Sequence, residues 1–371
     1  MPPTQNPRIL FVRLSALGDV IQTLPVVAAI RQKHPQAHIG WITDEDFADY
    51  LRAVPEIDQI IAIPRKGWLK MLINPLRWKE LTQEIKEFKD QVQAGNYEVG
   101  IDVQGLLKTA LLLYLTGLKR RIGFDHWREW TGLFYTERYI KRQEYFDPEF
   151  YHIQHMFRLL EPLGCKPFDS KNVDFALASL SQEVISSIEK KLSVLKQKES
   201  LIGIILGTQW ESKLWPLEHW QKLIKNIISQ TDASVVLVGG KADSSKSEET
   251  INQILKEAPE QASCLLNLCG QTSFFELQGL LSKMQIVIGA DTAPVHLAGA
   301  VGTPLVISLF GPTASRRTAP VGKEEIQVLR TKLDLSCLPC HQRVCKIEDK
   351  NLCMNSISPE EVFKVIKDFL R

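Results

Sequence analysis

Asp19 is the first residue whose type and position could do chemistry. It follows the apolar run of residues 9–12 and a turn that we expect at Gly18, and it lies where a helix should begin. A carboxylate just beyond the end of a strand can act as a general base on an incoming hydroxyl group. It can equally cap the helix, whose positive end would lower its pKa and weaken it as a base. Such a base still suffices where the hydroxyl loses its proton late in the reaction.

Lys213 is the second candidate, in a loop that follows the apolar run of residues 201–206. Gly207 at the end of that run would let backbone N–H groups approach a phosphate. Lys213 is then either a mobile positive charge beside a diphosphate or a solvated loop lysine. Of the tryptophans on either side of it, Trp210 could stack on a ring, whereas Trp215 is expected to be buried.

A third group of polar residues follows the apolar run of residues 286–288. Gly289, Asp291 and Thr292 come directly after it, and a helix is expected next. The free N–H groups of that helix start, together with the Thr292 hydroxyl, would bind an anion such as a diphosphate. Asp291 could bind sugar hydroxyls or cap the helix. His296 could be a phosphate ligand or a packed interior imidazole.

Short apolar runs that alternate with helical stretches must position these residues. Strands are predicted at residues 9–12, 39–42, 59–63 and 99–103 in the first half, and at 201–206, 234–238, 264–268, 285–288 and 305–309 in the second. Helical spacing lies between them, for example over residues 20–34 and 81–91. This alternation predicts two mainly parallel sheets, each covered by helices on both faces.

The domain boundary is expected in the Ser- and Lys-rich stretch between residues 167 and 199, which gives domains of residues 1–180 and 181–371. Two Rossmann-like doubly wound domains facing a central cleft fit the GT-B architecture, and also other two-domain α/β enzymes. A last helix is predicted at residues 358–370, with Ser358 as its cap, and it could pack back on the first domain.

Composition excludes several classes of protein. The 371 residues are 44% hydrophobic and 24% charged, as in a globular protein, and a net charge of +2 argues against a nucleic-acid binder. No run approaches the roughly 18 to 20 apolar residues that span a membrane. Residues 1–8 do not resemble a signal peptide, so a cytoplasmic location is expected.

Four ordered segments carry a family resemblance. They are residues 15–25, residues 101–110 with 120–124, residues 207–216, and residues 289–298 continuing through 302–304 to 309–313. In this order they resemble the ADP-heptose:lipopolysaccharide heptosyltransferase family, glycosyltransferase family 9, and most closely heptosyltransferase I. Because the four segments are spread over nearly the whole chain, the resemblance is specific.

The resemblance implies a role for each matched residue. Asp19 would be the catalytic base. Donor binding would fall to Thr208, Lys213, Gly289, Asp291, Thr292 and His296, and acceptor binding to Ser15, Gly18, Gln104, Lys108, Arg120 and Arg121. One departure stands out, because Ala293 occupies a position where the family usually has glycine. If that position needs a positive φ, alanine would be strained there.

The implied reaction is an inverting displacement that moves heptose from ADP-heptose to a lipopolysaccharide core or lipid-linked acceptor. Asp19 would take the acceptor proton, while Lys213 and the helix start at Thr292 stabilise the departing diphosphate. No cofactor and no metal are then needed, and no DxD-type ligand pair stands near a strand end.

Three other functions compete with this one. A GT-B transferase could use another nucleotide sugar for a different surface glycan. A dinucleotide-dependent oxidoreductase would show a GxGxxG turn after its first strand, and none follows residues 9–12. A binding module without catalysis would tolerate the loss of Asp19, which is present.

Cations alternate with Trp and Leu over residues 65–79. Such a run is a solvated helix face, a peripheral membrane contact, or a docking site for an anionic lipid-linked glycan. With Lys119, Arg120 and Arg121 it favours an acidic acceptor in the first domain, at the inner face of the cytoplasmic membrane.

Four of the seven cysteines crowd together as Cys337, Cys340, Cys345 and Cys353. Two residues separate Cys337 from Cys340, which is a spacing typical of zinc ligands, but the other gaps match no zinc signature. Structural thiols are the preferred interpretation, and a bound metal is the alternative.

Overall fold

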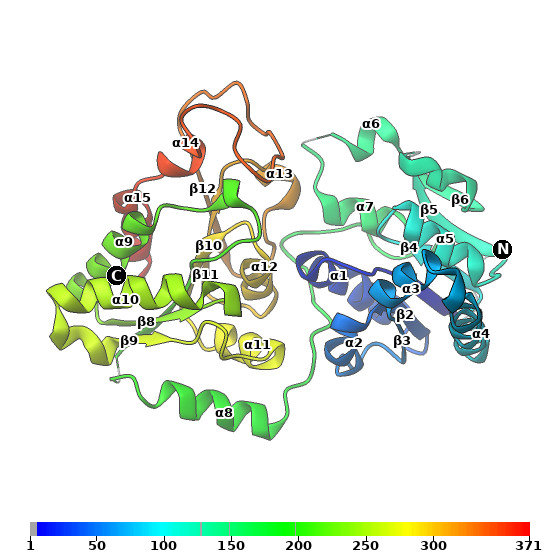
Figure 1. Cartoon of the computed structure of the whole chain (residues 1–371), viewed down its shortest axis with the longest axis horizontal. Coiled ribbons are helices and arrows are strands. Elements are labelled where there is room, and N and C mark those ends of the chain that lie inside the picture. Colours follow the sequence, from blue (N-terminus) through cyan, green and yellow to red (C-terminus); the bar gives the residue numbers. More distant parts are fainter. Residues whose placement is uncertain (1–5, 127, 148, 197) are drawn as a thin grey trace. The chain divides into compact units, whose positions relative to one another are not determined.

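The computed structural model describes residues 6–126, 128–147, 149–196 and 198–371. The chain forms two compact units, Met1–Asp169 with Asp174–Ser179, and Ser170–Val173 with Leu180–Arg371. Each unit holds one six-stranded sheet (Figure 1). Residues 1–5, on which the cytoplasmic prediction partly rests, lie outside the described residues.

The N-terminal unit is a parallel sheet with the strand order β3-β2-β1-β4-β5-β6. Its strands are β1 (Arg8–Val12), β2 (His38–Asp44), β3 (Gln59–Ile63), β4 (Val99–Asp102), β5 (Arg120–Asp125) and β6 (Glu137–Lys141). Its helices, with 3-10 helices marked η, are α1 (Leu17–Lys33), α2 (Glu45–Arg52), α3 (Arg65–Leu72), η1 (Pro75–Arg77), α4 (Trp78–Ala94), α5 (Leu107–Leu115), η2 (Arg128–Leu133), α6 (Arg142–Tyr145), α7 (His152–Arg158) and η3 (Glu161–Leu163).

The C-terminal unit repeats this topology with the order β12-β11-β10-β7-β8-β9. Its strands are β7 (Ser200–Ile205), β8 (Ala233–Val238), β9 (Leu265–Asn267), β10 (Ile286–Ala290), β11 (Leu305–Phe310) and β12 (Glu325–Arg330). Its helices are α8 (Gln182–Leu192), η4 (Glu211–Lys213), α9 (Leu217–Gln230), η5 (Lys241–Asp243), α10 (Ser244–Glu257), η6 (Pro259–Cys264), α11 (Phe274–Ser282), α12 (Ala293–Ala300), α13 (Ser315–Thr318), α14 (Leu352–Asn355) and α15 (Pro359–Phe369).

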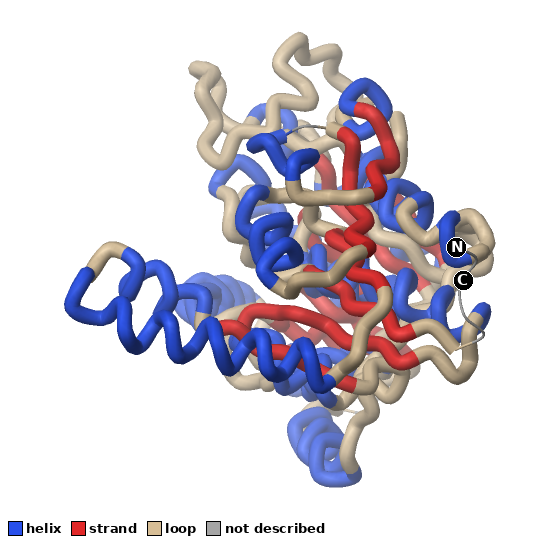
Figure 2. The backbone as a smooth tube through the Cα atoms, turned by 90° about the vertical axis from the view of Figure 1, so that its right-hand side faces the viewer, coloured by secondary structure: helices blue, strands red, loops and turns tan. Residues whose placement is uncertain are grey.

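The strand order decides which helices share a face of each sheet. From β1 the chain adds strands in one direction through β3 and then returns to add β4, β5 and β6 on the other side. Because crossovers between parallel strands are right-handed, α1 and α2 cover one face, whereas α3, α4, α5 and η2 cover the other. Figure 2 lets the reader follow the strands and the helices that connect them.

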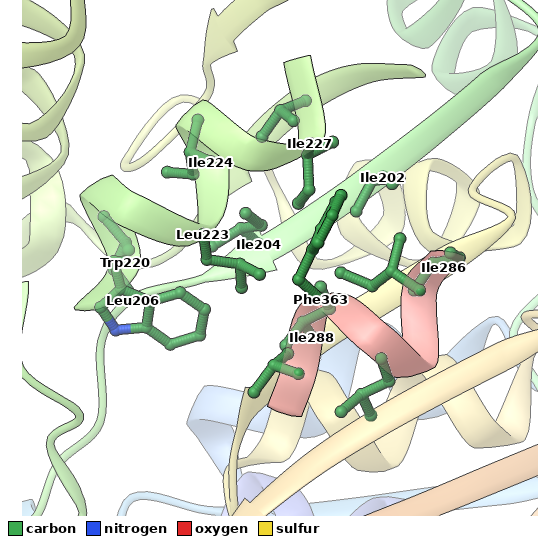
Figure 3. Packing of buried hydrophobic residues seen from close by; sticks show 14 of the residues in the cluster. Ile202, Ile204, Leu206, Trp220, Leu223, Ile224, Ile227, Ile286, Ile288 and Phe363 are labelled. Carbon is green, nitrogen blue, oxygen red and sulfur yellow. The ribbon is translucent and has the colours of Figure 1, made fainter. Parts of the chain in front are cut away.

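The C-terminal core is built on one face of its sheet by α9 and α15. Trp220, Leu223 and Ile227 of α9 pack with Phe363 of α15 against isoleucines of β7 and β10 (Figure 3). Ser358 caps α15 by accepting a hydrogen bond from the N–H of Glu361 at 3.2 Å, as the sequence predicted. The last helix therefore packs in the core of the C-terminal unit, and its contact with the first domain stays a prediction.

Strands with strongly apolar sequences were predicted to within a few residues, but three edge-side strands were missed. Both β5 and β6 begin with charged residues, and β12 is a partly exposed edge strand with the pattern Glu-Ile-Gln-Val-Leu-Arg. Their polar composition hides them, because a buried strand is predicted only where apolar residues form a continuous run. No helix among the described residues is long and apolar enough to span a membrane.

Candidate active site

Most of the predicted site residues lie at one place in each unit. In a doubly wound sheet, ligands bind beyond the carboxyl ends of the strands, where the strand order reverses. That point lies between β1 and β4 in the first unit and between β7 and β10 in the second. Asp19 and Gln104 follow the first pair of strands, whereas Lys213 and Asp291 follow the second.

Asp19 lies in the first turn of α1 and is held by a buried arginine. Its Oδ2 is 2.9 Å from a terminal nitrogen of Arg13 and accepts the Ala16 N–H at 3.1 Å. Arg13 is itself anchored, because it also donates to the Val103 carbonyl at 2.7 Å. The Asp19 side chain is 45% exposed, whereas that of Arg13 is 3% exposed. The carboxylate is thus fixed from one side and open on the other.

The electrostatic setting keeps Asp19 ionised. Burial raises the pKa of Asp19, but Arg13, His152 and the Ala16 N–H outweigh that effect and hold the pKa below its ordinary value. A carboxylate with a low pKa is a weak base in the ground state. It can accept a proton only from a hydroxyl that has become acidic through bond formation.

Gln104 joins the loops that follow β1 and β4. Its side-chain oxygen accepts the Leu14 N–H at 2.9 Å. Its own loop is shaped by the fully buried Asp102, which accepts the N–H groups of Gln104 and Gly105 at 2.9 Å and the Tyr135 hydroxyl at 2.7 Å. Burial raises the pKa of Asp102 despite these donors. Gln104 therefore positions the turn in front of Asp19.

Lys108 is half-buried at the start of α5, near other cations. Burial, then Arg65 and Arg13, lower its pKa, because each of them disfavours a further positive charge. Arg65 in turn pairs with the buried Asp44 at 2.7 Å. An anionic ligand at this edge would relieve the crowding of charge. Arg65 had been assigned only to the basic run of residues 65–79, so its place at the site was missed.

Two of the predicted acceptor residues have another position than expected. Arg120 and Arg121 begin β5 and align with the amino end of β4, so they lie roughly 13 to 16 Å along the strand from its carboxyl end. Arg120 forms a bidentate pair with Glu137, and Arg121 donates to the carbonyls of Phe134 and Leu118. The structure does not bring them to Asp19.

The turn before α1 also differs from the prediction. Gly18 is a helical residue of α1 and not the residue that makes the turn, which runs through the half-buried Ser15. Gly18 is not among the residues with a positive φ.

Lys213 is fixed by Asp291 and is not mobile as the sequence suggested. Its ammonium group lies 2.7 Å from Asp291 Oδ2 and donates to the Asp291 carbonyl at 3.0 Å. It also lies 4.6 Å from the centre of the Trp210 ring. The ammonium has three donors and two are used by Asp291, so one remains for a ligand.

Asp291 is the centre of the second site and is 8% exposed. Besides Lys213, it accepts hydrogen bonds from the Thr313 hydroxyl at 2.8 Å and His296 Nε2 at 3.3 Å. Burial would raise its pKa, but His296 and Lys213 outweigh burial and hold it well below its usual range. His296 is 7% exposed and is bonded to Asp291, which fits the interior imidazole rather than the phosphate ligand.

Thr292 caps α12 at the carboxyl end of β10. Its hydroxyl oxygen is buried and has no hydrogen-bond partner in the part of the chain that the structure describes. A buried hydroxyl without a partner is costly, which makes a ligand the natural partner. Ala293 is the first residue of α12 and is not among the residues with a positive φ, so alanine is unstrained here. Gly289 is required by packing, because a Cβ would lie 2.7 Å from Val295.

The loop after β7 contributes Thr208, whose hydroxyl accepts the Trp210 N–H at 3.4 Å. Gly207 is needed for a reason that the sequence did not give. A Cβ there would lie 1.9 Å from the Asp243 carboxylate, so an acidic side chain occupies the space that we expected to admit a phosphate. Trp215 is buried, as predicted, and donates to the Ile357 carbonyl at 2.9 Å.

A C-terminal loop adds residues that sequence reasoning had left unassigned. His341 lies close enough to Arg317 and Lys213 that, after burial, their charges lower its pKa. The Arg343 guanidinium lies 5.9 Å from the Trp210 ring, and the Arg343 carbonyl accepts the Ser212 N–H at 3.1 Å. The loop is therefore attached to η4, which carries Lys213.

The four clustered cysteines lie in or beside this loop as free thiols. Burial raises the pKa of Cys353 to about 11, and Cys340, Cys345 and Cys337 add to the shift, which shows that the four are neighbours. No group of three or more His, Cys, Asp or Glu side chains in the described ranges is arranged to hold a metal ion.

Comparison with known proteins supplies the family. Residues 85–351 match the family described as glycosyltransferase family 9 (heptosyltransferase). The chain belongs to glycosyltransferase family 9. It is accordingly a glycosyltransferase, as the sequence predicted.

Relatives in this family match almost end to end. Lipopolysaccharide heptosyltransferase 1 of Pseudomonas aeruginosa is 25% identical over 370 residues, which cover 96% of each chain. The protein of the same name from Campylobacter coli is 25% identical over 97% of this chain and 98% of its own.

Solved structures share the fold at lower identity. The ADP-heptose lipopolysaccharide heptosyltransferase II of Escherichia coli aligns with a TM-score of 0.73 and 19% identity over 98% of both chains. The E. coli heptosyltransferase WaaC with ADP aligns with a TM-score of 0.72 and 20% identity, covering 98% of this chain and 99% of its own. These likenesses confirm the GT-B class for this member of family 9.

Proposed function

We propose that the chain transfers heptose from ADP-heptose to a lipopolysaccharide core or another anionic lipid-linked acceptor, with inversion and without a metal ion. The names of the relatives support the sugar and the acceptor class. The proposal is carried by the residues at the two switch points. The exposed carboxylate of Asp19 lies at the first, and Lys213 lies with the start of α12 at the second.

Asp19 is the base in this proposal. The acceptor oxygen forms a bond to the anomeric carbon as the bond from that carbon to the ADP oxygen breaks. The acceptor hydroxyl grows acidic as its oxygen bonds to carbon, and its proton passes to Asp19. The low pKa of Asp19 fits this late transfer. Arg13 keeps Oδ2 in place, which leaves Oδ1 for the proton.

The C-terminal unit takes the donor diphosphate in this proposal. Lys213 and the N–H groups at the start of α12 face negative charge that grows on the departing phosphate, and the Thr292 hydroxyl gains the partner that it lacks among the described residues. These groups supply positive charge of the kind that a divalent cation supplies in other transferases. Thr208, Gly289 and Asp291 shape this pocket, and Asp291 holds Lys213 in position.

The acceptor is proposed to bind the N-terminal unit near Lys108, where Arg65 adds positive charge. Ser15 and Gln104 shape the turn that presents Asp19. Arg120 and Arg121 are left out of this site because of their place in β5. The reaction would take place in the cytoplasm, at the membrane face that carries the acceptor.

A donor screen tests the proposal. Purified protein is incubated with a heptose-free lipopolysaccharide core and ADP-heptose, or with UDP-, GDP- or dTDP-sugars, and products are identified by mass spectrometry. We expect transfer from ADP-heptose alone, unchanged in EDTA. Transfer only from another nucleotide sugar would assign the same GT-B chemistry to a different surface glycan, and full loss in EDTA would contradict metal independence.

A further inference from the structure

An exposed apolar patch lies at the turn between α3 and α4 of the N-terminal unit. The exposed fractions of its side chains are 58% for Leu69, 60% for Leu72, 81% for Ile73, 91% for Leu76 and 54% for Trp78. Single exposed apolar side chains are common on protein surfaces. Five within residues 69–78 form a cluster of the kind that marks an interaction site.

The opposite side of α3 is packed, so the exposure of the patch is a property of the fold. Met71 is buried, and the Trp68 ring meets the Phe88 ring of α4 edge to face at 5.9 Å. Trp68 Nε1 also donates to Glu84 at 2.6 Å. Since α3 cannot turn its buried face outward without losing these contacts, Leu69 and Leu72 are held toward the outside.

The turn itself is ordered by hydrogen bonds. Trp78 Nε1 donates to the Leu72 carbonyl at 3.0 Å, and the Asn74 side chain accepts the Leu76 N–H at 3.2 Å. The indole is therefore fixed by its polar edge while more than half of its surface stays exposed. Ile73 and Leu76 occupy the tip of a defined turn.

A second strip of exposed apolar side chains lies on the same face of the sheet. It comes from α5 and η2, which share that face with α3 and α4 because of the crossover handedness. Its members are Leu107, Leu111, Tyr114, Trp130 and Leu133. The Leu107 N–H donates to the Glu129 carboxylate at 2.9 Å, which ties α5 to η2. This side of the unit thus exposes apolar side chains both at the turn between α3 and α4 and on α5 and η2.

The charges around the patch select its partner. Residues 65–79 contain five lysines and arginines and no acidic residue. Arg65, Lys66 and Arg77 pair with acidic residues outside the run, whereas Lys70 and Lys79 are exposed beside the apolar tip. Exposed cations next to Trp and Leu side chains fit the interface of an anionic bilayer, where tails accept the apolar groups and headgroups accept the charge.

We infer that residues 69–79 form a membrane-docking surface that inserts Leu72, Ile73, Leu76 and Trp78 among the headgroups of an anionic bilayer. Because α3 starts at the carboxyl end of β3, it begins at the same edge of the sheet as Lys108 and Asp19. Docking would bring lipid-linked glycans to that edge. The inference rests on the proposed function in this last respect alone.

Vesicle co-sedimentation tests the docking surface. The full chain is mixed at low salt with vesicles of phosphatidylcholine, with and without phosphatidylglycerol. We expect binding to the anionic vesicles, weakened by salt, and a loss on the order of tenfold or more for the combined variant Leu72→Ser, Ile73→Ser, Leu76→Ser. The combined variant Lys70→Gln, Lys79→Gln should lower binding to anionic vesicles and leave the weak binding to neutral vesicles unchanged.

A matched variant controls for the loss of exposed apolar surface in general. Val194→Ser, Leu333→Ser and Phe369→Ser change three exposed side chains of the C-terminal unit, and binding should be unaffected. The combined variant Leu72→Ser, Ile73→Ser, Leu76→Ser is called the apolar variant below. Absence of binding to any vesicle, or binding by the apolar variant equal to that of the wild type, would overturn the inference. The inference would also be overturned if the full chain formed a dimer that the apolar variant abolished while its vesicle binding was unchanged. A second copy of the chain would then cover the patch.

A transfer assay separates this inference from the proposed function. With a water-soluble, deacylated acceptor, the apolar variant should retain wild-type turnover, whereas with acceptor in vesicles it should be slower. Transfer without vesicle binding would remove the docking surface alone. Vesicle binding without heptose transfer would remove the proposed function alone.

Discussion

The two units have the same strand order and place an aspartate at the same edge, yet the two carboxylates have different surroundings. Asp19 is 45% exposed and contacts one arginine. Asp291 is 8% exposed and contacts Lys213, His296 and Thr313. Topology alone therefore supplies a position for an acid, and the neighbours decide what the acid does.

This difference indicates a division of work. Asp19 makes both of its described contacts through Oδ2, so its other oxygen is open to a substrate. Asp291 uses its oxygens to accept hydrogen bonds from its own neighbours, and in the proposed mechanism it acts on a substrate through Lys213. The exposed surfaces differ in the same sense, because eleven of the sixteen exposed large apolar side chains among the described residues belong to the N-terminal unit. The unit with the open acid is also the one with the apolar face.

Replacing the open acid should have the largest effect. Asp19→Asn keeps the shape and an acceptor for Arg13 and Ala16 but cannot take a proton, so kcat should fall about a thousandfold. Steady-state kinetics with ADP-heptose would measure this, and a thermal shift with donor should be unchanged. A variant within tenfold of wild type would remove Asp19 from the role of base and erase the contrast with Asp291.

Replacing the lysine of the closed site should have the next largest effect. In the proposed mechanism Lys213→Gln removes the charge that faces the departing phosphate, so kcat/KM should fall about a hundredfold. Unlike Asp19→Asn, it should also weaken the thermal shift caused by donor. Lys222→Gln in α9 is the matched control, because its ion pair with Glu360 is exposed and its loss should change neither property. Normal kinetics for Lys213→Gln would move the donor site elsewhere.

Asp291 should matter for stability in a pH-dependent way. Its folded-state pKa lies below the unfolded value of about 3.9, so folding favours the ionised form. The stabilisation is full above that pH and is lost as the pH falls through the folded-state pKa. At pH 7, Asp291→Asn should cost about 3 kcal/mol, because Lys213 loses its buried partner. Denaturant unfolding from pH 7 to pH 3 should show the difference between the two proteins begin to shrink below about pH 4, and a constant difference would contradict the pairing.

Much of the fold could be predicted because its strands are apolar on both faces. Such strands stand out as continuous runs, and the residues that follow them, Asp19 and Thr292 among them, were placed at the correct edge. Each of the four resemblance segments also includes a loop at one of the switch points. Arg120 and Arg121 show where this reasoning stops. Without β5 in the prediction, nothing indicated that they begin a strand, at the opposite edge.

The contacts of the site depend on residues far apart in the chain. Thr313 bonds to Asp291 across 22 positions, and the Ser212 hydroxyl donates to the Gln342 carbonyl across 130. No local pattern reports such pairs. Arg13 was a nearer miss, because it follows β1 directly and stands two positions before the first resemblance segment, residues 15–25. A buried arginine next to an exposed acid becomes visible only when burial is known.

The smallest effects should come from two glycines with a positive φ, one in each unit. Gly105, with φ of 69°, follows β4 beside Gln104, and a Cβ there would lie 2.6 Å from the Phe124 ring and 2.8 Å from His126 Nε2. Gly302, with φ of 77°, follows α12, and a Cβ there would meet open space. Alanine at Gly302 should cost about 1 kcal/mol from backbone strain alone.

Alanine at Gly105 should cost about 2 to 3 kcal/mol, because overpacking adds to the strain. Urea unfolding would measure both variants. Since Gly105 adjoins the residue that braces the turn before Asp19, Gly105→Ala should also reduce kcat, whereas Gly302→Ala should leave it unchanged. Equal costs for the two variants would show that the loop after β4 yields to the added methyl group, and the rigid support that we assign to the open acid would be absent.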